Sequence, residues 1–299
     1  MNPSFQAADE LASLSIMVII PALNEQECIE KVVGAVPQWV RRIIVVDNGS
    51  TDDTPGRAAA AGAQVVREPR RGYGRACLTG CAAATDADII VFLDGDLSDY
   101  PERMEQLVRP IAEDHADFVI GSRTRGAREA GALLPQQRFG GWLACVLIRL
   151  FWGYRYTDLG PFRAIRIASL NRLRMDDQNF GWTVQMQVRA VVAGLRIMEI
   201  PVDYRRRIGK SKISGTLRGV LGAGSKILYS IGREVCVARH RVRLGHPSPE
   251  SWRAGLLDDV RRIAIPASLI GPARVVEVDA KYRPLPRWPD RQAFGVRNL

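Results

Sequence analysis

The first 120 residues alternate short apolar runs with longer stretches of helical pattern, and this rhythm constrains the fold more than any other feature. The apolar runs are rich in β-branched residues and cover 16–20, 43–46, 64–66, 89–93 and 118–120. Helical patterns between them cover 25–36, 52–61, 74–83 and 101–113. Strands without polar alternation belong to sheets that helices cover on both faces. The sequence therefore predicts an α/β fold with a doubly wound, mostly parallel sheet.

Beyond Gly121 this rhythm breaks, and the second part of the chain is predicted to have a different organisation. A Gly/Arg-rich loop precedes helices over 138–152 and about 182–193, a strand over 197–202, and a helical stretch over about 216–239. We predict one domain over 1–245, with halves at 14–122 and 123–245, followed by an irregular proline-rich tail over 246–299.

Charge is divided unevenly along the chain. Residues 1–120 hold 10 Lys and Arg against 19 Asp and Glu, a net charge of −9, whereas the remainder carries +19. This asymmetry favours separate tasks, such as holding a metal and attracting a polyanion, although unevenly solvated surfaces are an alternative. The five cysteines include no Cys-x-x-Cys pair, which argues against a disulfide scaffold or a structural zinc site. Because no apolar run is long enough to span a bilayer, we expect a cytoplasmic protein, with peripheral attachment to the inner face of the membrane as a further option.

Two polar motifs follow the first two predicted strands. Pro-Ala-Leu-Asn-Glu occupies 21–25, and Asp-Asn-Gly-Ser-Thr-Asp occupies 47–52. Each alone is compatible with a turn and a helix cap. Together, at the carboxyl ends of neighbouring strands, they favour a nucleotide site.

The strongest local signal is Asp94-Gly95-Asp96, which directly follows an apolar strand. Two carboxylates about 4 Å apart repel each other by roughly 4 kcal/mol at an effective dielectric constant of 20, unless a cation relieves them. Mg²⁺ and Mn²⁺ prefer such oxygen ligands, share them with substrate phosphates and neutralise a departing diphosphate. A solvent-exposed acidic turn is a poorer explanation behind so apolar a strand.

These motifs, with Arg-Gly-Tyr-Gly-Arg at 71–75 and Gly-Ser-Arg at 121–123, resemble the family 2 glycosyltransferases, which have the GT-A fold. The resemblance covers about 16–212 and is nearest to the polyprenyl-phosphate (dolichyl-phosphate) mannose or glucose synthases. It implies a metal ion, Mg²⁺ or Mn²⁺, on Asp94 and Asp96. It also implies that the nucleotide-sugar contacts come from Pro21, Leu23, Glu25, Asp47, Gly72, Arg75 and Asp94.

The second half resembles the acceptor side of the same synthases. The acceptor phosphate would be held by Arg123, Arg138, Arg163, Arg206, Lys210, Ser211 and Lys212, and guanidinium groups do bind phosphate well. A solvated basic loop is the alternative for 205–212. The catalytic set would be Asp94, Asp96, Asp158 and Gln185. Two positions depart from the family pattern, because Ser98 and Gln185 stand where Gln and Glu are usual.

The expected reaction is inverting transfer of a hexose from a UDP- or GDP-linked donor to a polyprenyl phosphate. A phosphomonoester with a second pKa of about 6 is its own ionised nucleophile and needs no protein base. The alternative is a hydroxyl acceptor with Asp158 as the base. A nucleic-acid-binding protein fits less well, because the basic loop lacks interleaved aromatics, and so does a sugar nucleotidyltransferase, because 21–25 has no Gly-rich basic turn. The amphipathic pattern over 216–239 suits either a lipid surface or the protein core.

Overall fold

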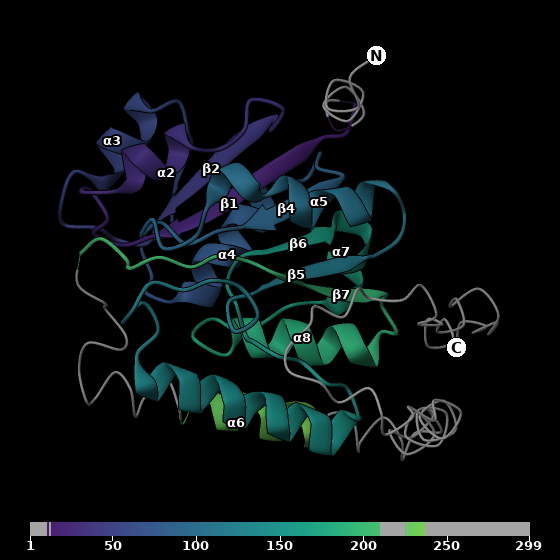
Figure 1. Ribbon diagram of the computed structural model, residues 1–299. Coiled ribbons are helices and arrows are strands. Elements are labelled where there is room, and N and C mark those ends of the chain that lie inside the picture. Colours follow the sequence, from purple (N-terminus) through teal and green to yellow (C-terminus); the bar gives the residue numbers. More distant parts are fainter. Residues whose placement is uncertain (1–10, 12, 210–224, 226, 237–299) are drawn as a thin grey trace, which may run out of the picture.

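The computed structural model describes residues 11, 13–209, 225 and 227–236, and a sheet of seven strands forms the centre of this described part (Figure 1). The order of the strands across the sheet is β3-β2-β1-β4-β6-β5-β7. Their bounds are β1 (Ile16–Ala22), β2 (Arg42–Asp47), β3 (Gln64–Arg67), β4 (Ile89–Phe92), β5 (Phe118–Ser122), β6 (Arg163–Arg166) and β7 (Ile197–Pro201). All five strands predicted in the first 120 residues are present.

The sheet is mostly parallel, as predicted, with one antiparallel strand inserted. β1 pairs in parallel with β2 and β4, whereas β6 runs antiparallel to both β4 and β5. β6 has only four residues and an arginine at each end, so no periodicity marks it in the sequence. After β1 the chain forms β2 and β3 on one side of β1 and then returns as β4 on the other side. This reversal creates a topological switch point at the carboxyl ends of β1 and β4.

Helices cover both faces of the sheet. One core cluster joins the sheet to α4 (Tyr73–Ala83), α6 (Pro135–Trp152) and α8 (Trp182–Val192). The other joins it to α2 (Ile29–Gly34), α3 (Thr54–Ala60) and α5 (Glu105–Ala112). The short helix α7 (Ile167–Leu173) follows β6, and a 3₁₀ turn, η1 (Pro101–Arg103), precedes α5. The predicted helix over 25–36 begins late, at Ile29, because 25–28 form turns at the end of β1.

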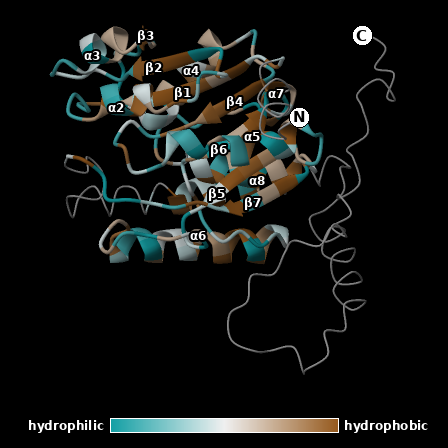
Figure 2. Cartoon of the chain, turned by 45° about the horizontal axis from the view of Figure 1, so that its top comes forward, coloured by the Kyte–Doolittle hydropathy of each residue, from teal (hydrophilic) through white to brown (hydrophobic). Residues whose placement is uncertain are grey.

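Burial explains the strand pattern of the sequence. Ile19, Val46 and Phe92 are fully buried, and Figure 2 shows the central strands as the most hydrophobic part of the described chain. Gly80 lets α4 approach β1, since a Cβ there would lie 2.4 Å from Ile19 Cγ2. This close contact packs the second half of α4 against β1 and β2.

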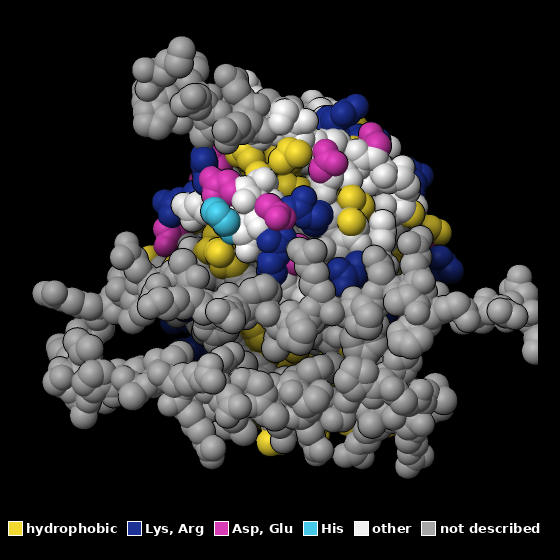
Figure 3. All heavy atoms as spheres, turned by 90° about the vertical axis from the view of Figure 1, so that its right-hand side faces the viewer, with side chains coloured by type: hydrophobic (Ala, Val, Ile, Leu, Met, Phe, Trp, Pro, Cys, Tyr) yellow, Lys and Arg dark blue, Asp and Glu magenta, His cyan; other side chains and the backbone are white. Residues whose placement is uncertain are grey.

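The second part of the predicted domain is described only in places. Residues 225 and 227–236 are helical, in agreement with the prediction over 216–239, and Ile231 of this helix is buried. The rest of that stretch, the boundary at 245 and the tail over 246–299 lie outside the described residues. On the face that Figure 3 shows, basic and acidic side chains of the described residues lie side by side.

Candidate active site at the strand ends

The motifs after β1 and β2 interlock as one unit. Ala22 and Asp47 are partners in the parallel register of the two strands. The backbone N–H of Asn24 donates to Ser50 Oγ at 2.9 Å, and the N–H of Glu25 donates to Thr54 Oγ1 at 2.8 Å. Asp47 is buried and its Oδ1 accepts the Ser50 N–H at 2.9 Å. The two motifs therefore meet at the carboxyl ends of β1 and β2, as their positions after neighbouring strands predicted.

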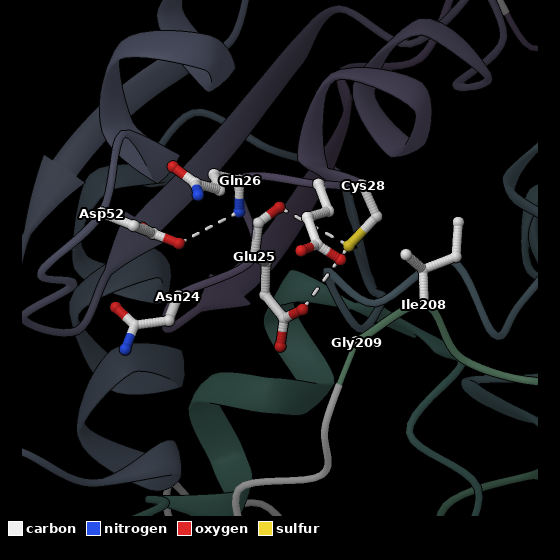
Figure 4. Close-up of a pocket in the computed structure, with 8 residues that line it drawn as sticks. Asn24, Glu25, Gln26, Cys28, Asp52, Ile208 and Gly209 are labelled. Carbon is white, nitrogen blue, oxygen red and sulfur yellow. Dashed lines mark hydrogen bonds between the residues drawn. The ribbon is translucent and has the colours of Figure 1, made fainter.

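A polar pocket opens at the end of β1 (Figure 4). One wall is the turn after β1, in which Cys28 Sγ donates to Glu25 Oε2 at 3.5 Å and the Gln26 N–H donates to Asp52 Oδ2 at 3.3 Å. Ile208 and Gly209, far along the chain, form the opposite wall. The basic segment that follows β7 thus lines the same pocket as Glu25, which the sequence analysis assigned to the nucleotide.

Glu25 is the predicted nucleotide residue that lines this pocket, and the others lie around it. Pro21 is within β1, and Leu23 is half-buried in the turn. The complete lining is Asn24, Glu25, Gln26, Glu27, Cys28, Asp52, Ile208 and Gly209. Of these, Gln26, Glu27 and Cys28 lie outside the motifs that the sequence analysis named, although they directly follow Glu25 in the chain.

The Gly72–Arg75 turn lies beside the end of β2. Gly72 has φ +147°, and its N–H donates to Asn48 Oδ1 at 2.8 Å. A Cβ at this position would lie 2.2 Å from the carbonyl oxygen of Gln178, so only glycine fits. The half-buried Arg75 donates its N–H to the same carbonyl at 3.1 Å. Tyr73, which starts α4, donates its hydroxyl to Asp94 Oδ1 at 3.2 Å and so links this turn to the aspartate pair.

Asp94 and Asp96 lie in the loop that directly follows β4, and their surroundings differ. Asp96 is 4% exposed, and its Oδ1 accepts hydrogen bonds from the N–H of Ser98, at 3.0 Å, and from the Ser98 hydroxyl. Its Oδ2 lies 3.0 Å from Arg207 Nη2. Burial, together with the negative charge of Asp96, raises the pKa of Asp94 to about 7. The charges of Arg207 and Arg123 lower the pKa of Asp94 but do not offset burial and the repulsion between the two carboxylates.

Asp99 adds a third carboxylate that sequence reasoning did not single out. It is 1% exposed, and within the described part of the chain neither of its oxygens has a hydrogen-bond partner. Burial first, and then the charges of Asp94 and Asp96, raise its pKa well above the ordinary value. Buried polar atoms without partners are rare and costly. The donor chemistry of this segment therefore fits a hard divalent cation.

The described residues do not, however, form a complete cage for such an ion. No group of three or more His, Cys, Asp or Glu side chains among them is arranged to hold a metal. Mg²⁺ characteristically takes one or two carboxylates and completes its shell with water and substrate phosphates. The aspartate pair suits this shared kind of site.

The basic segment after β7 lies directly against the aspartate segment. The Arg205 N–H donates to the Ser98 carbonyl at 3.0 Å, and the Ile208 N–H donates to the Asp96 carbonyl at 3.0 Å. The Arg205 guanidinium donates to the Leu97 carbonyl at 2.6 Å and lies 4.3 Å from the centre of the Tyr100 ring. These backbone contacts join the two halves of the chain and bring Arg207 within 3.0 Å of the Asp96 carboxylate.

Within this segment Arg207 is the arginine that contacts the aspartate pair, whereas the sequence analysis had named Arg206, for the acceptor phosphate. Arg207 contacts Asp96, whereas Arg206 faces the loop before α6, with its N–H on Glu129 Oε2 at 2.8 Å and its Nε on the carbonyl of Ala130. Successive residues of an extended segment point to opposite sides, and this alternation was the signal available in the sequence. Lys210, Ser211 and Lys212 lie outside the described residues.

Asp158 is tightly paired with Arg123. Arg123 Nε and Nη2 donate to its two oxygens at 2.7 and 2.9 Å, and the Leu159 N–H donates to Oδ1 at 2.7 Å. Burial alone would raise the pKa of Asp158, but the charge and hydrogen bonds of Arg123 hold it below the ordinary value. A carboxylate with a lowered pKa and several donors is a weak base. The same pairing occupies two nitrogens of Arg123, which was expected to bind the acceptor.

Two predicted site residues are buried and have hydrogen-bond partners within the protein. Arg163 is 1% exposed, and its guanidinium donates to the carbonyls of Leu159, Gly160 and Thr183. Gln185 is also 1% exposed, and its Oε1 accepts the N–H groups of the loop at 176–177 at 3.0 and 2.9 Å. The guanidinium of Arg163 is bonded to backbone carbonyls, and Gln185 Nε2 donates to the carboxylates of Asp176 and Glu234 at 2.6 and 3.0 Å. Sequence patterns do not report such partners. Arg138 is exposed on the first turn of α6.

Comparison with known proteins agrees with this geometry. Residues 17–175 match the family described as glycosyl transferase family 2. An uncharacterized glycosyltransferase of Mycobacterium tuberculosis is 39% identical over 217 residues, which cover 70% of this chain and 94% of the relative. The undecaprenyl-phosphate mannosyltransferase of Micrococcus luteus is 29% identical over 223 residues, covering 69% of this chain and 90% of that protein.

Among solved structures, glucosyl-3-phosphoglycerate synthase from Mycobacterium tuberculosis, in complex with Mn²⁺, UDP and phosphoglyceric acid, superposes with a TM-score of 0.63 at 24% identity. The match covers 77% of this chain and 82% of that one and shows a shared fold. The predicted GT-A architecture is thereby confirmed. With its family match over more than half of its length, the chain belongs to glycosyl transferase family 2 and is a glycosyltransferase of the GT-A fold.

Proposed function

We propose that this enzyme is a metal-dependent, inverting glycosyltransferase that moves a hexose from a nucleotide-diphosphate sugar to a polyprenyl-phosphate acceptor. The observation that carries the proposal is the contact between the Asp94–Asp96 pair and the arginine segment, at the strand ends where ligands bind in open α/β sheets. The carboxylates suit the cation of the donor, and the arginines suit two phosphorylated substrates.

Asp94 and Asp96 are the residues that would hold Mg²⁺ or Mn²⁺, and the metal would supply positive charge to the departing diphosphate. Support comes from the pKa of Asp94, which burial and Asp96 raise to about 7, because a cation is what such a pair lacks. Glucosyl-3-phosphoglycerate synthase was crystallised with Mn²⁺ and with Mg²⁺, each together with UDP.

The nucleoside of the UDP- or GDP-linked donor is assigned to the polar pocket at the end of β1. Glu25 and Asp52 line this pocket, and buried Asp47 stands at the neighbouring strand end. Carboxylates here can accept hydrogen bonds from ribose hydroxyls or from a base N–H, as in other doubly wound folds. Gly72 and Arg75 flank this position on the turn that reaches Asp94 through Tyr73.

A phosphate acceptor suits the site better than a hydroxyl acceptor. Asp158 is committed to Arg123, and Gln185 is neutral and buried, so neither side chain offers a free base. A phosphomonoester with a second pKa of about 6 needs none. Its attack opposite the leaving diphosphate inverts the anomeric carbon. The name of the Micrococcus luteus relative, an undecaprenyl-phosphate mannosyltransferase, supports the same acceptor class.

Peripheral attachment to a membrane is proposed on the basis of α6. Phe139, Trp142 and Leu150 are 62%, 59% and 56% exposed and, with Val146, recur at helical spacing along one side of the helix. α6 contains arginines but no acidic residue, which suits an anionic lipid surface. No described helix is both long and apolar enough to cross a bilayer. The loop before α6 binds Arg206, so this apolar stripe begins next to the basic segment.

The acceptor is tested with purified protein, Mn²⁺ and labelled UDP- or GDP-hexoses. Parallel reactions contain polyprenyl phosphate, free polyprenol or 3-phosphoglycerate. We expect a product that extracts into organic solvent only with polyprenyl phosphate, at a rate that rises as pH passes about 6 and then levels off. Transfer to a hydroxyl of 3-phosphoglycerate or polyprenol, and none to polyprenyl phosphate, would overturn the acceptor assignment while leaving the glycosyltransferase intact.

Membrane attachment is tested by flotation with vesicles that contain phosphatidylglycerol. The variant Phe139→Glu/Trp142→Glu is expected to lose binding by about tenfold or more, because two charges would enter the bilayer interface. Ala59→Glu/Ala60→Glu on α3 is the matched control, since it adds the same charge at exposed positions on the other face of the sheet. Equal vesicle binding by both variants would contradict the assignment of α6.

A further inference from the structure

Arg207 connects the two acidic motifs of the site. Its Nη2 lies 3.0 Å from Asp96 Oδ2 and 3.5 Å from Glu25 Oε1. Its Nε is buried and, among the described residues, has no hydrogen-bond partner. The guanidinium therefore stands between the pocket at the end of β1 and the aspartate pair, held there by charge.

The backbone around Arg207 is anchored independently of its side chain. On one side Arg205 bonds to the carbonyls of Ser98 and Leu97, and on the other the N–H of Ile208 bonds to the Asp96 carbonyl. The Arg207 side chain is 31% exposed. It can consequently leave Asp96 without the segment losing its attachment to the sheet.

A divalent cation and Arg207 compete for the same oxygen. Asp96 Oδ1 already accepts two hydrogen bonds from Ser98, so a cation bound by this carboxylate would take the oxygen that Arg207 contacts. Like charges a few ångströms apart repel strongly in a partly buried site. A bound donor diphosphate would reverse this balance, because it would bring several negative charges with which Arg207 could pair.

We propose that Arg207 neutralises Asp96 before the metal binds and that the metal displaces it from Asp96. The released guanidinium then contacts the diphosphate of the donor. The inference rests on the proposed metal-dependent function. It differs from a simple phosphate-binding role in one respect. Removing the guanidinium should strengthen the binding of the metal alone and weaken the binding of the nucleotide.

The test is Arg207→Gln, with Mn²⁺ binding measured by electron paramagnetic resonance in the absence of nucleotide. We expect the Kd for Mn²⁺ to fall by about tenfold, which corresponds to about 1.4 kcal/mol. UDP and GDP are then titrated separately at saturating Mn²⁺. Whichever binds the unmodified protein is expected to bind the variant about tenfold more weakly.

Two further variants separate this effect from general charge and from misfolding. Arg206→Gln removes the same charge one residue away, from a side chain that faces Glu129, and should leave the Mn²⁺ affinity within about twofold of the original. Arg207→Lys keeps the charge and should bind Mn²⁺ nearly as the unmodified protein does. Thermal unfolding of each variant verifies that it is folded.

Unchanged Mn²⁺ affinity in Arg207→Gln, or a loss of Mn²⁺ and nucleotide affinity together, would overturn the inference. A wrong acceptor assignment would give a different result. The unmodified protein would then transfer no hexose to polyprenyl phosphate, while Arg207→Gln would still bind Mn²⁺ more tightly and the nucleotide more weakly. Failure of the metal assignment is seen as absence of Mn²⁺ binding by the unmodified protein, and this result would overturn both proposals.

Discussion

Asp96→Asn changes the contacts of the aspartate pair in a way that can be followed atom by atom. The asparagine oxygen still accepts the Ser98 N–H, which lies 3.0 Å from Asp96 Oδ1. The new NH₂ group replaces Oδ2, which lies 3.0 Å from Arg207 Nη2, so that two donors face each other. The substitution therefore removes one negative charge and one ion pair while it preserves the turn.

The expected loss of stability is small and the expected loss of activity is large. The Arg207 side chain is 31% exposed, and an ion pair of this kind contributes about 1 kcal/mol or less. For a domain of this size that corresponds to about 2 to 4 °C in Tm. Removing one preorganised electrostatic group from an active site costs about 100- to 1,000-fold in rate, and loss of a charged metal ligand belongs at the upper end.

The measurement is transfer of labelled hexose as Mn²⁺ is titrated, with a thermal scan of the same preparation. Asp86→Asn is the matched control, because Asp86 is exposed and pairs with Arg42 at the start of β2, the end of the strand opposite to the site. We expect the control to retain full activity. A fully active Asp96→Asn enzyme, or one whose activity persists in EDTA, would refute the assignment of the metal to this carboxylate.

Three further predictions follow from the surroundings of single residues. Because burial and Asp96 raise the pKa of Asp94 to about 7, the folded state without metal binds more protons than the unfolded state, so its stability should fall as pH rises from about 4 to 7. Thermal scans in EDTA should show a steeper fall in the unmodified protein than in Asp94→Asn, in which buried Asp99, whose pKa is also raised, still contributes, while Mn²⁺ binding strengthens over the upper part of that range. Gly72→Ala should cost about 3 kcal/mol or more in urea unfolding, because its Cβ would lie 2.2 Å from a carbonyl oxygen, whereas Gly62→Ala, at φ +96° with nothing within 4 Å, should cost only about 1 kcal/mol, and equal losses would contradict the steric argument. Asp158→Asn should destabilise the fold by about 3 to 5 kcal/mol because it leaves Arg123 buried and unpaired, and lost activity in a variant of unchanged Tm would restore Asp158 as a base.

The architecture of the first 120 residues could be predicted because the signals that specify it are local. The runs at 16–20 and 89–93 lack polar alternation, and this is the pattern of strands covered on both faces. Asp94 and Asp96 could be assigned to the site for the same reason, since a polar motif directly after such a strand lies at the edge where ligands bind. The order of the motifs along the chain likewise indicated the family.

The acceptor side could not be predicted residue by residue, because there the function of a side chain depends on which segment it meets. Arg163 and Arg207 are both arginines after polar loops, yet one is fully bonded to backbone carbonyls and the other reaches Asp96 across 111 positions of the chain. Gln185 has the spacing of a catalytic residue, but its amide holds a neighbouring loop. Hydrophobic periodicity reports which residues are buried near their sequence neighbours. The partners of a polar side chain, in β6 and α8 as much as in the segment of Arg207, are set by contacts with other segments, which arise only when the whole chain is packed.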